Sequence, residues 1–136
     1  MIKVIYFDLG KVIVNFDYGV AIREIMKVTP RPLPEVISVL NDQTLLVDYE
    51  TGKVSTLDFY QTISDRLKLD LPLAEFRQLW GNMFLPEPLL SEELLKALKS
   101  RYRLILFSNT NEIHFEFVQQ KYPILSHIEE HLLSYR

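Results

Sequence analysis

The first ten residues, MIKVIYFDLG (1–10), carry an apolar run that ends at an aspartate, Asp8, with a glycine, Gly10, two residues later. A second apolar run about a hundred residues later, LILFSNT (104–110), ends in the same way at Ser108. Short runs rich in β-branched and aromatic residues are typical of strands buried on both faces of a parallel sheet. Ligands of open α/β sheets bind just beyond the carboxyl ends of the strands, so the two runs predict that Asp8 and Ser108 lie side by side at one crevice.

The composition is that of one modest globular domain. The chain has 136 residues, of which 48% are hydrophobic, enough to build a genuine core. A net charge of −3 and a pI near 5.6 give no broad basic face, which argues against nucleic acid or an anionic membrane and favours a small-molecule partner. The absence of cysteine excludes disulfides and thiolate chemistry. We see no signal-peptide pattern and no run approaching the roughly 20 apolar residues of a membrane span, so we expect a cytoplasmic protein.

The segment between the two runs is predicted to be helical. Apolar periodicity indicates four helices, over about 18–28, 35–46, 55–67 and 73–84. Asp17 and Ser55 are well placed as N-caps of the first and third of these helices. A helical block this large, directly after the first strand, is expected to form a cap over the crevice.

The whole chain is therefore predicted to be an α/β protein. We expect a parallel, three-layer Rossmannoid core formed by residues 1–16 and 90–136, and a four-helix cap formed by residues 17–89. Within the second half, helices are expected after Ser91 and over about 113–121, with a possible third strand near Leu132.

The two strand ends suggest a specific chemistry. Asp8 alone could be no more than a polar end to a strand, because a short motif has a high false-positive rate. Ser108, followed by Asn109 and Thr110, would add a hydroxyl and backbone donors beside that carboxylate. A carboxylate nucleophile next to donors for an anion is the arrangement used in phosphoryl transfer.

Three segments carry a resemblance to a known family. Residues 7–17 resemble the first motif of the haloacid dehalogenase superfamily, and most closely the branch with bacterial α-D-glucose-1-phosphate phosphatase and the phosphatase-like half of epoxide hydrolase. Residues 106–111 resemble the second motif of that branch, and residues 49–55 resemble a segment of its helical cap. The resemblance spans nearly the whole chain.

The resemblance implies a Mg²⁺-dependent phosphatase acting on a small sugar-phosphate-like metabolite. Asp8 would attack phosphorus and form an aspartyl-phosphate. Mg²⁺ would be held by the Asp8 carboxylate and the backbone carbonyl of Gly10, while Ser108 and Asn109 would bind the phosphate oxygens. A metal and several donors are needed there, because a phosphate dianion is otherwise repelled by a carboxylate.

The chain departs from the family pattern at two places. Most members carry an aspartate as general acid and base two residues after the nucleophile, where this chain has Gly10. Members also have a later lysine and an acidic strand end that have no counterpart up to Arg136, and Lys121 comes too early to match that lysine. The chain thus resembles a member truncated at its C-terminal side, so a catalytically incompetent fragment or binding module, or a metal-independent haloacid dehalogenase, are the alternatives.

The same comparison implies an exposed sheet edge. The first strand is central in the family, so without the later strands residues 2–8 would form an apolar edge, and we expect self-association or instability. His127 and His131 are expected to be solvated surface residues, and His114 a surface or capping residue. Trp80 is expected in the core of the cap.

Overall fold

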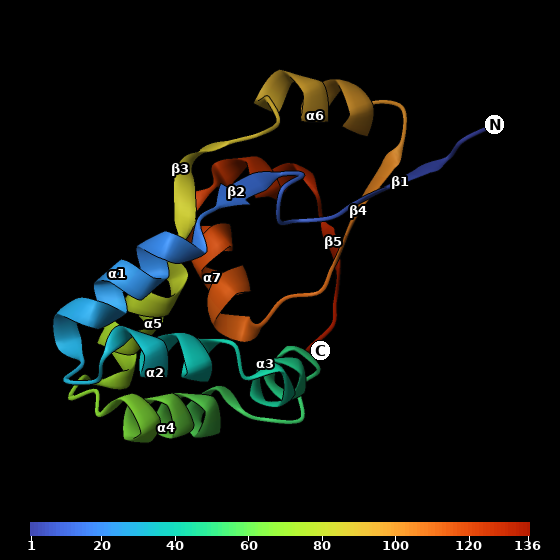
Figure 1. The fold of residues 1–136 in the computed structure, drawn as a ribbon. Coiled ribbons are helices and arrows are strands. Elements are labelled where there is room, and N and C mark those ends of the chain that lie inside the picture. Colours follow the sequence, from blue (N-terminus) through green and yellow to red (C-terminus); the bar gives the residue numbers. More distant parts are fainter.

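The computed structural model describes all residues 1–136. In chain order the elements are β1 (Val4–Phe7), β2 (Val14–Phe16), α1 (Tyr18–Val28), α2 (Leu33–Leu40), α3 (Gln43–Glu50), α4 (Thr56–Leu67), α5 (Leu73–Gly81), β3 (Phe84–Pro88), α6 (Glu92–Lys99), β4 (Arg103–Ser108), α7 (Glu112–Lys121), the 3₁₀ helix η1 (Pro123–His127) and β5 (Glu130–Leu133). Helices α1 to α5 gather at one end of the molecule, and strands β1, β4 and β5 lie at the other (Figure 1). None of the helices is long and apolar enough to cross a lipid bilayer.

The main sheet is parallel, as the sequence predicts. Its strand order is β1-β4-β5, with Phe7 paired to Leu106 and Ser108 paired to Leu133. The possible third strand at Leu132 and Leu133 is confirmed as β5, which begins at Glu130. Strand β1 pairs only with β4, which leaves its other edge without a partner, as we expected for this strand.

Helices cover only one face of this sheet. Leu95 of α6, Phe115 of α7 and Leu106 of β4 are all fully buried in one apolar cluster. On the opposite face the side chains of Tyr6, Phe107 and Leu132 are 60%, 63% and 50% exposed. The expectation of three layers is therefore wrong for residues 1–136, because no segment of the chain packs on that second face.

A small antiparallel pair, which we did not predict, closes the base of the helical block. Strand β2 pairs with β3, with Val14 opposite Pro88 and Phe16 opposite Phe84. The rings of Phe16 and Phe84 meet edge to face with their centroids 6.1 Å apart. This pair joins the points where the chain leaves the core and returns to it, so it orients the cap above the sheet.

The helical block contains five helices where four were expected. The predicted helix over 35–46 is wrong, since the chain breaks at Asn41 and starts a new helix, α3, after Asp42. The Asp42 carboxylate accepts a hydrogen bond from the backbone N–H of Leu45 at 3.1 Å and one from Arg66 at 2.6 Å. The Asp42 N-cap, which is paired with Arg66, thus starts a new helix even though the apolar periodicity continues across the break.

The other helix starts agree with the sequence. Asp17 accepts from the N–H of Gly19 at 2.8 Å, and Ser55 accepts from the N–H of Asp58 at 3.1 Å. Helix α5 is shorter than expected and ends at Gly81, because the next residues turn into β3.

Aromatic side chains fill the centre of the cap. Phe59 stacks on Tyr49 with ring centroids 4.1 Å apart and meets Trp80 edge to face at 5.0 Å. Ile113, from helix α7 of the core, is buried in the same cluster. The expected place of Trp80 in the cap core is confirmed.

Helix α7 connects the cap to the sheet. Arg77 of α5 forms ion pairs with Glu112 at 3.1 Å and with Glu116 at 2.7 Å, both on α7. The C-terminal end of the chain lies near α3 (Figure 1), and a Cβ added to Gly52 would stand 2.5 Å from the backbone oxygen of Tyr135. The cap therefore contacts the rest of the molecule at two places: α5 pairs with α7, and the turn after α3 meets the C-terminal end of the chain.

Candidate active site

Asp8 and Ser108 lie at the carboxyl ends of neighbouring parallel strands. Asp8 directly follows β1 and Ser108 is the last residue of β4, and the pairing of Phe7 with Leu106 brings the two ends to the same edge of the sheet. Both residues, with Asn109, line one open groove of about 670 Å³. The structure thus brings together three of the four residues singled out in the sequence.

The Asp8 carboxylate is exposed and oriented by the backbone. Its Oδ1 accepts a hydrogen bond from the N–H of Leu9 at 2.7 Å. No side chain or backbone group of the chain bonds to its Oδ2. One carboxylate oxygen is therefore fixed, and the other is open to the groove.

Gly10, the fourth residue, lies in a tight loop that wraps back on itself. The carbonyl of Leu9 accepts from the N–H groups of Ile13 at 2.9 Å and Val14 at 3.1 Å, and Lys11 adopts a left-handed φ of 63°. The carbonyl of Gly10 accepts no hydrogen bond from the protein. It remains available as an oxygen ligand beside Asp8.

The aromatic ring of Phe16 occupies the space beside Gly10. A Cβ placed on Gly10 would lie 2.7 Å from Cε1 of Phe16. Real Cβ atoms do not approach this closely, so a side chain at position 10 requires the ring to move. The loop is thus built around a glycine at the position where the family commonly has an aspartate.

Ser134 holds the loop that follows Ser108. The N–H of Ser134 donates to the carbonyl of Ser108 at 3.1 Å, and its hydroxyl accepts from the N–H of Thr110 at 3.0 Å. Ser108 and Thr110 are buried, whereas Asn109 between them is exposed at the groove. The strand β5 therefore supports the segment that presents Ser108 and Asn109.

A second, more enclosed cavity of about 350 Å³ lies between the sheet and the cap. The lining residues from 1–16 and 90–136 are Leu9, Gly10, Phe16, Ser108, Asn109, Thr110, Asn111 and His114. Those from 17–89 are Tyr18, Ala21, Ile22, Ile37, Leu40, Asn41, Gln43, Leu46, Glu50, Trp80, Met83 and Phe84. Ser108 and Asn109 border both the cavity and the groove, so they join the two spaces. Small-molecule sites are typically mostly apolar concavities of this size with a few polar groups.

His114 lines this cavity as a neutral imidazole. Its Nε2 lies 3.2 Å from the carbonyl of Trp80 and its Nδ1 lies 3.0 Å from the side-chain nitrogen of Asn111. The Nε2–H therefore donates to the carbonyl, and Nδ1 accepts from the amide. Burial lowers the pKa of His114 to about 4, only partly opposed by its bond to Trp80.

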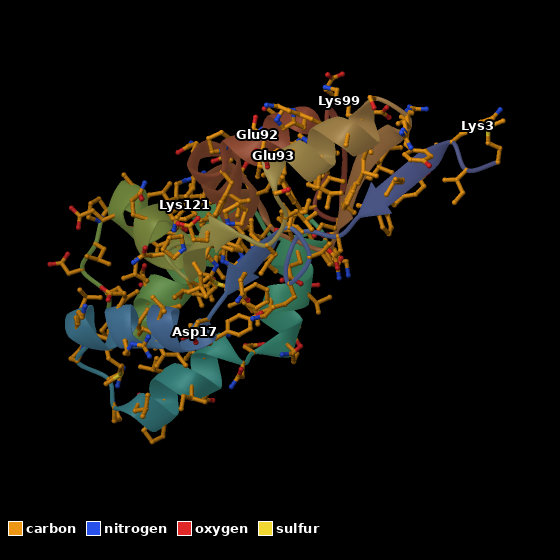
Figure 2. All side chains as sticks on the ribbon, turned by 90° about the horizontal axis from the view of Figure 1, so that it is seen from above. Lys3, Asp17, Glu92, Glu93, Lys99 and Lys121 are labelled. Carbon is orange, nitrogen blue, oxygen red and sulfur yellow. The ribbon has the colours of Figure 1, made fainter.

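Other candidates lie away from the nucleophile. The ammonium of Lys121, which is labelled in Figure 2, donates to the carbonyl of Phe84 at 2.8 Å, and Lys121 is not among the residues that line either space. His127 pairs with Glu92 at 3.0 Å. His131 is not the solvated residue we expected, since its ring packs edge to face on Phe115 at 5.1 Å. No group of three or more histidine, aspartate or glutamate side chains is arranged to hold a metal.

Several residues of the cavity were missed in the sequence. Glu50 lies within the segment 49–55 that carries the cap resemblance, yet nothing in the sequence shows that its side chain faces the core. Tyr18 and His114 were likewise not assigned to a site. The only available signal was the positions of these residues near the junctions of predicted elements.

The comparisons with known proteins agree with this fold. No family model matches the chain. A D-ribitol-5-phosphate phosphatase of Bacteroides thetaiotaomicron is 27% identical over 142 aligned positions, which cover 100% of this chain and 69% of that protein.

Solved structures of similar proteins share this fold. A haloacid dehalogenase family enzyme of Bacteroides thetaiotaomicron, crystallised with magnesium and inorganic phosphate, matches with a TM-score of 0.86 and 23% identity over 99% of this chain and 70% of its own. A predicted hydrolase of the same kind from Porphyromonas gingivalis matches with a TM-score of 0.77 and 24% identity over 99% and 67% of the two chains. The fold is that of the haloacid dehalogenase-like enzymes. The family resemblance identified in the sequence is thereby confirmed.

Proposed function

We propose that this chain hydrolyses phosphate monoesters of a small, sugar-phosphate-like metabolite, with Asp8 as the nucleophile and Mg²⁺ as cofactor. The observation that carries the proposal is the position of the Asp8 carboxylate and the Ser108 hydroxyl at adjacent strand ends on one groove. The related phosphatase acts on D-ribitol 5-phosphate, and a related structure holds magnesium and phosphate, which support the same chemistry here.

The reaction follows from the orientation of Asp8. Its Oδ1 is engaged by the N–H of Leu9, so the free Oδ2 attacks phosphorus as the bond to the leaving alcohol breaks. The alcohol leaves with a proton, and the phosphoryl group remains on Asp8. Water then attacks phosphorus, releases inorganic phosphate and regenerates the carboxylate. The Ser108 hydroxyl and the Asn109 amide donate to the phosphate oxygens throughout.

The oxygen donors near Asp8 fit a magnesium ion. Mg²⁺ prefers oxygen ligands and commonly takes one or two carboxylates, with waters and substrate phosphate completing its shell. The Asp8 carboxylate and the unpaired carbonyl of Gly10 would be its protein ligands. When bound, the ion would offset the repulsion between the carboxylate and the phosphate.

Gly10 contributes no proton to the leaving alcohol. The aspartate common in the family would require the ring of Phe16 to move from its place beside position 10. The alcohol must take its proton from another donor, such as water in the groove.

The test is hydrolysis of an aryl phosphate by the chain and by Asp8→Asn, with and without Mg²⁺. We expect metal-dependent turnover that falls by at least about 1,000-fold in the variant, because the nucleophile is lost while the shape is kept. Asp65→Asn, a change at an exposed residue of α4, is the matched control and should be unaffected. Turnover that survives in Asp8→Asn would refute the assignment, and activity toward a haloacid that persists in a chelator would favour the metal-independent dehalogenase instead.

A binding module is the second candidate. It is favoured by the lack of any three-residue carboxylate or histidine cluster around Asp8. This candidate predicts no turnover, together with phosphate binding that weakens in Ser108→Ala.

We further propose that residues 1–16 and 90–136 act as the catalytic core, that residues 17–89 act as its cap, and that the chain works in the cytoplasm. Self-association through β1 is proposed because its edge lacks a partner and Tyr6, within the strand, is 60% exposed. Sedimentation over a range of concentrations tests this, and a monomer at all of them would contradict it.

A further inference from the structure

The cap contributes one carboxylate, Glu50, to the cavity above the candidate active site. Glu50 is the last residue of α3, is half-buried, and lines the cavity shared with Ser108 and Asn109. No hydrogen bond or ion pair joins its carboxylate to any group of the protein. A half-buried charge normally finds a partner, so an unpartnered one facing a cavity points to a ligand.

The surroundings of Glu50 do not neutralise it. Burial raises its pKa, and its place at the C-terminal end of α3 puts the charge at the negative end of the helix dipole. The other ionisable groups on the cavity wall are Tyr18 and His114, and no lysine or arginine is among the lining residues. His114 is neutral for the reasons given above, so the cavity carries an uncompensated negative charge.

The other polar groups on the cap side of the cavity can form hydrogen bonds with the hydroxyl groups of a substrate. Asn41 and Gln43, at the junction of α2 and α3, line the cavity, and Tyr18 lines it from α1. None of these three side chains makes a hydrogen bond within the protein, and all three are exposed at the mouth of the cavity, Tyr18 with 63% of its surface. Together with Glu50 they offer both donors and acceptors, which is what a polyhydroxylated carbon chain requires.

We propose that Glu50 selects the substrate by charge: the cavity accepts phosphate monoesters whose carbon chain carries uncharged hydroxyl groups, and it rejects those that carry a second anion. This inference rests on the proposed phosphatase function and specifies its substrate class. The hydroxyls bind to the Glu50 carboxylate and to the amides beside it. A carboxylate at the same place is repelled by the half-buried Glu50 carboxylate.

The experiment compares two compounds that differ at one end, glycerol 3-phosphate and 3-phosphoglycerate. We expect kcat/KM to favour glycerol 3-phosphate by about tenfold, since a like-charge contact opposes binding but is partly screened at a half-buried site. In Glu50→Gln, which keeps the shape and removes the charge, the preference should fall toward one, through a gain with 3-phosphoglycerate. Glu50→Lys should reverse the preference, and Asp65→Asn should leave it unchanged.

Binding is measured as well, so that a failure of charge selection can be distinguished from a failure of the proposed phosphatase function. The affinities of both compounds are determined by calorimetry on Asp8→Asn and on Asp8→Asn combined with Glu50→Gln. A preference for glycerol 3-phosphate that depends on Glu50 supports charge selection even if no turnover is found, and the lack of turnover would then refute only the phosphatase. A preference that is absent, or that is the same with and without Glu50, overturns charge selection whatever the turnover.

Discussion

Acidification should weaken this protein in part through one half-buried side chain, His114. A shift of its pKa from 6.5 to about 4 corresponds to about 3 kcal/mol of free energy of unfolding. The geometry explains the size of the effect. Protonation would place an N–H at Nδ1 against the side-chain nitrogen of Asn111, 3.0 Å away. The Asn111 amide cannot turn over freely, because its oxygen accepts from the N–H of His114 at 3.0 Å and caps α7.

The direction of the pH dependence follows from the depressed pKa. Between pH 6.5 and about 4 the unfolded chain binds a proton on this histidine that the folded chain does not. Stability is therefore unaffected by His114 above pH 6.5 and falls as the pH drops from 6.5 toward 4.

Urea denaturation of the wild type and His114→Gln at several pH values between 7 and 4 measures this contribution. The variant starts less stable because it loses ring contacts with Trp80 and Phe84, and its stability should then fall by about 3 kcal/mol less than that of the wild type over this range. Leu57→Ala, which leaves every titratable group in place on an exposed position, should keep the wild-type slope. Parallel pH profiles for the wild type and His114→Gln would refute the reasoning.

Three further changes test the site and the packing. Ser108→Ala should lower kcat/KM by about 100-fold by removing a donor to phosphate, and unchanged phosphatase kinetics would contradict its role. Gly52→Ala should cost at least about 1 kcal/mol in urea denaturation, since Gly52 has a φ of 73° and its Cβ would meet the Tyr135 oxygen at 2.5 Å; an equally stable variant would argue against this contact. Phe59→Ala should cost about 3–5 kcal/mol because the ring is fully buried in the cap, whereas Leu57→Ala, 51% exposed, should change the unfolding free energy by less than about 0.5 kcal/mol.

Local features of the sequence were sufficient for most elements. Apolar runs identify β1 and β4, and caps at Asp17 and Ser55 locate the starts of α1 and α4. These signals depend on residues close together in the chain, so they can be read without the fold. The break at Asn41 escaped because apolar residues continue on both sides of it, and the Arg66 that supports the Asp42 cap comes from a distant helix.

Contacts between distant segments were beyond the sequence. The β2–β3 pair joins residues about 70 positions apart, and neither strand has enough residues to show a pattern. The exposed second face of the main sheet was not predicted. Whether that face is buried depends on which segments pack against it, and the composition of the strands alone does not show this.

By itself, the sequence determined the parallel α/β class and the residues at the strand ends, because the order of apolar runs and the residues that follow them are local properties. The sequence thereby predicted that Asp8 and Ser108 lie at the same edge of the sheet. Only the tertiary structure decided what surrounds them: Phe16 beside Gly10, a neutral His114, and Glu50 facing the cavity from the cap. Those relations depend on how the cap packs on α7 and on the β2–β3 pair, and packing of distant segments sets which side chains share a cavity.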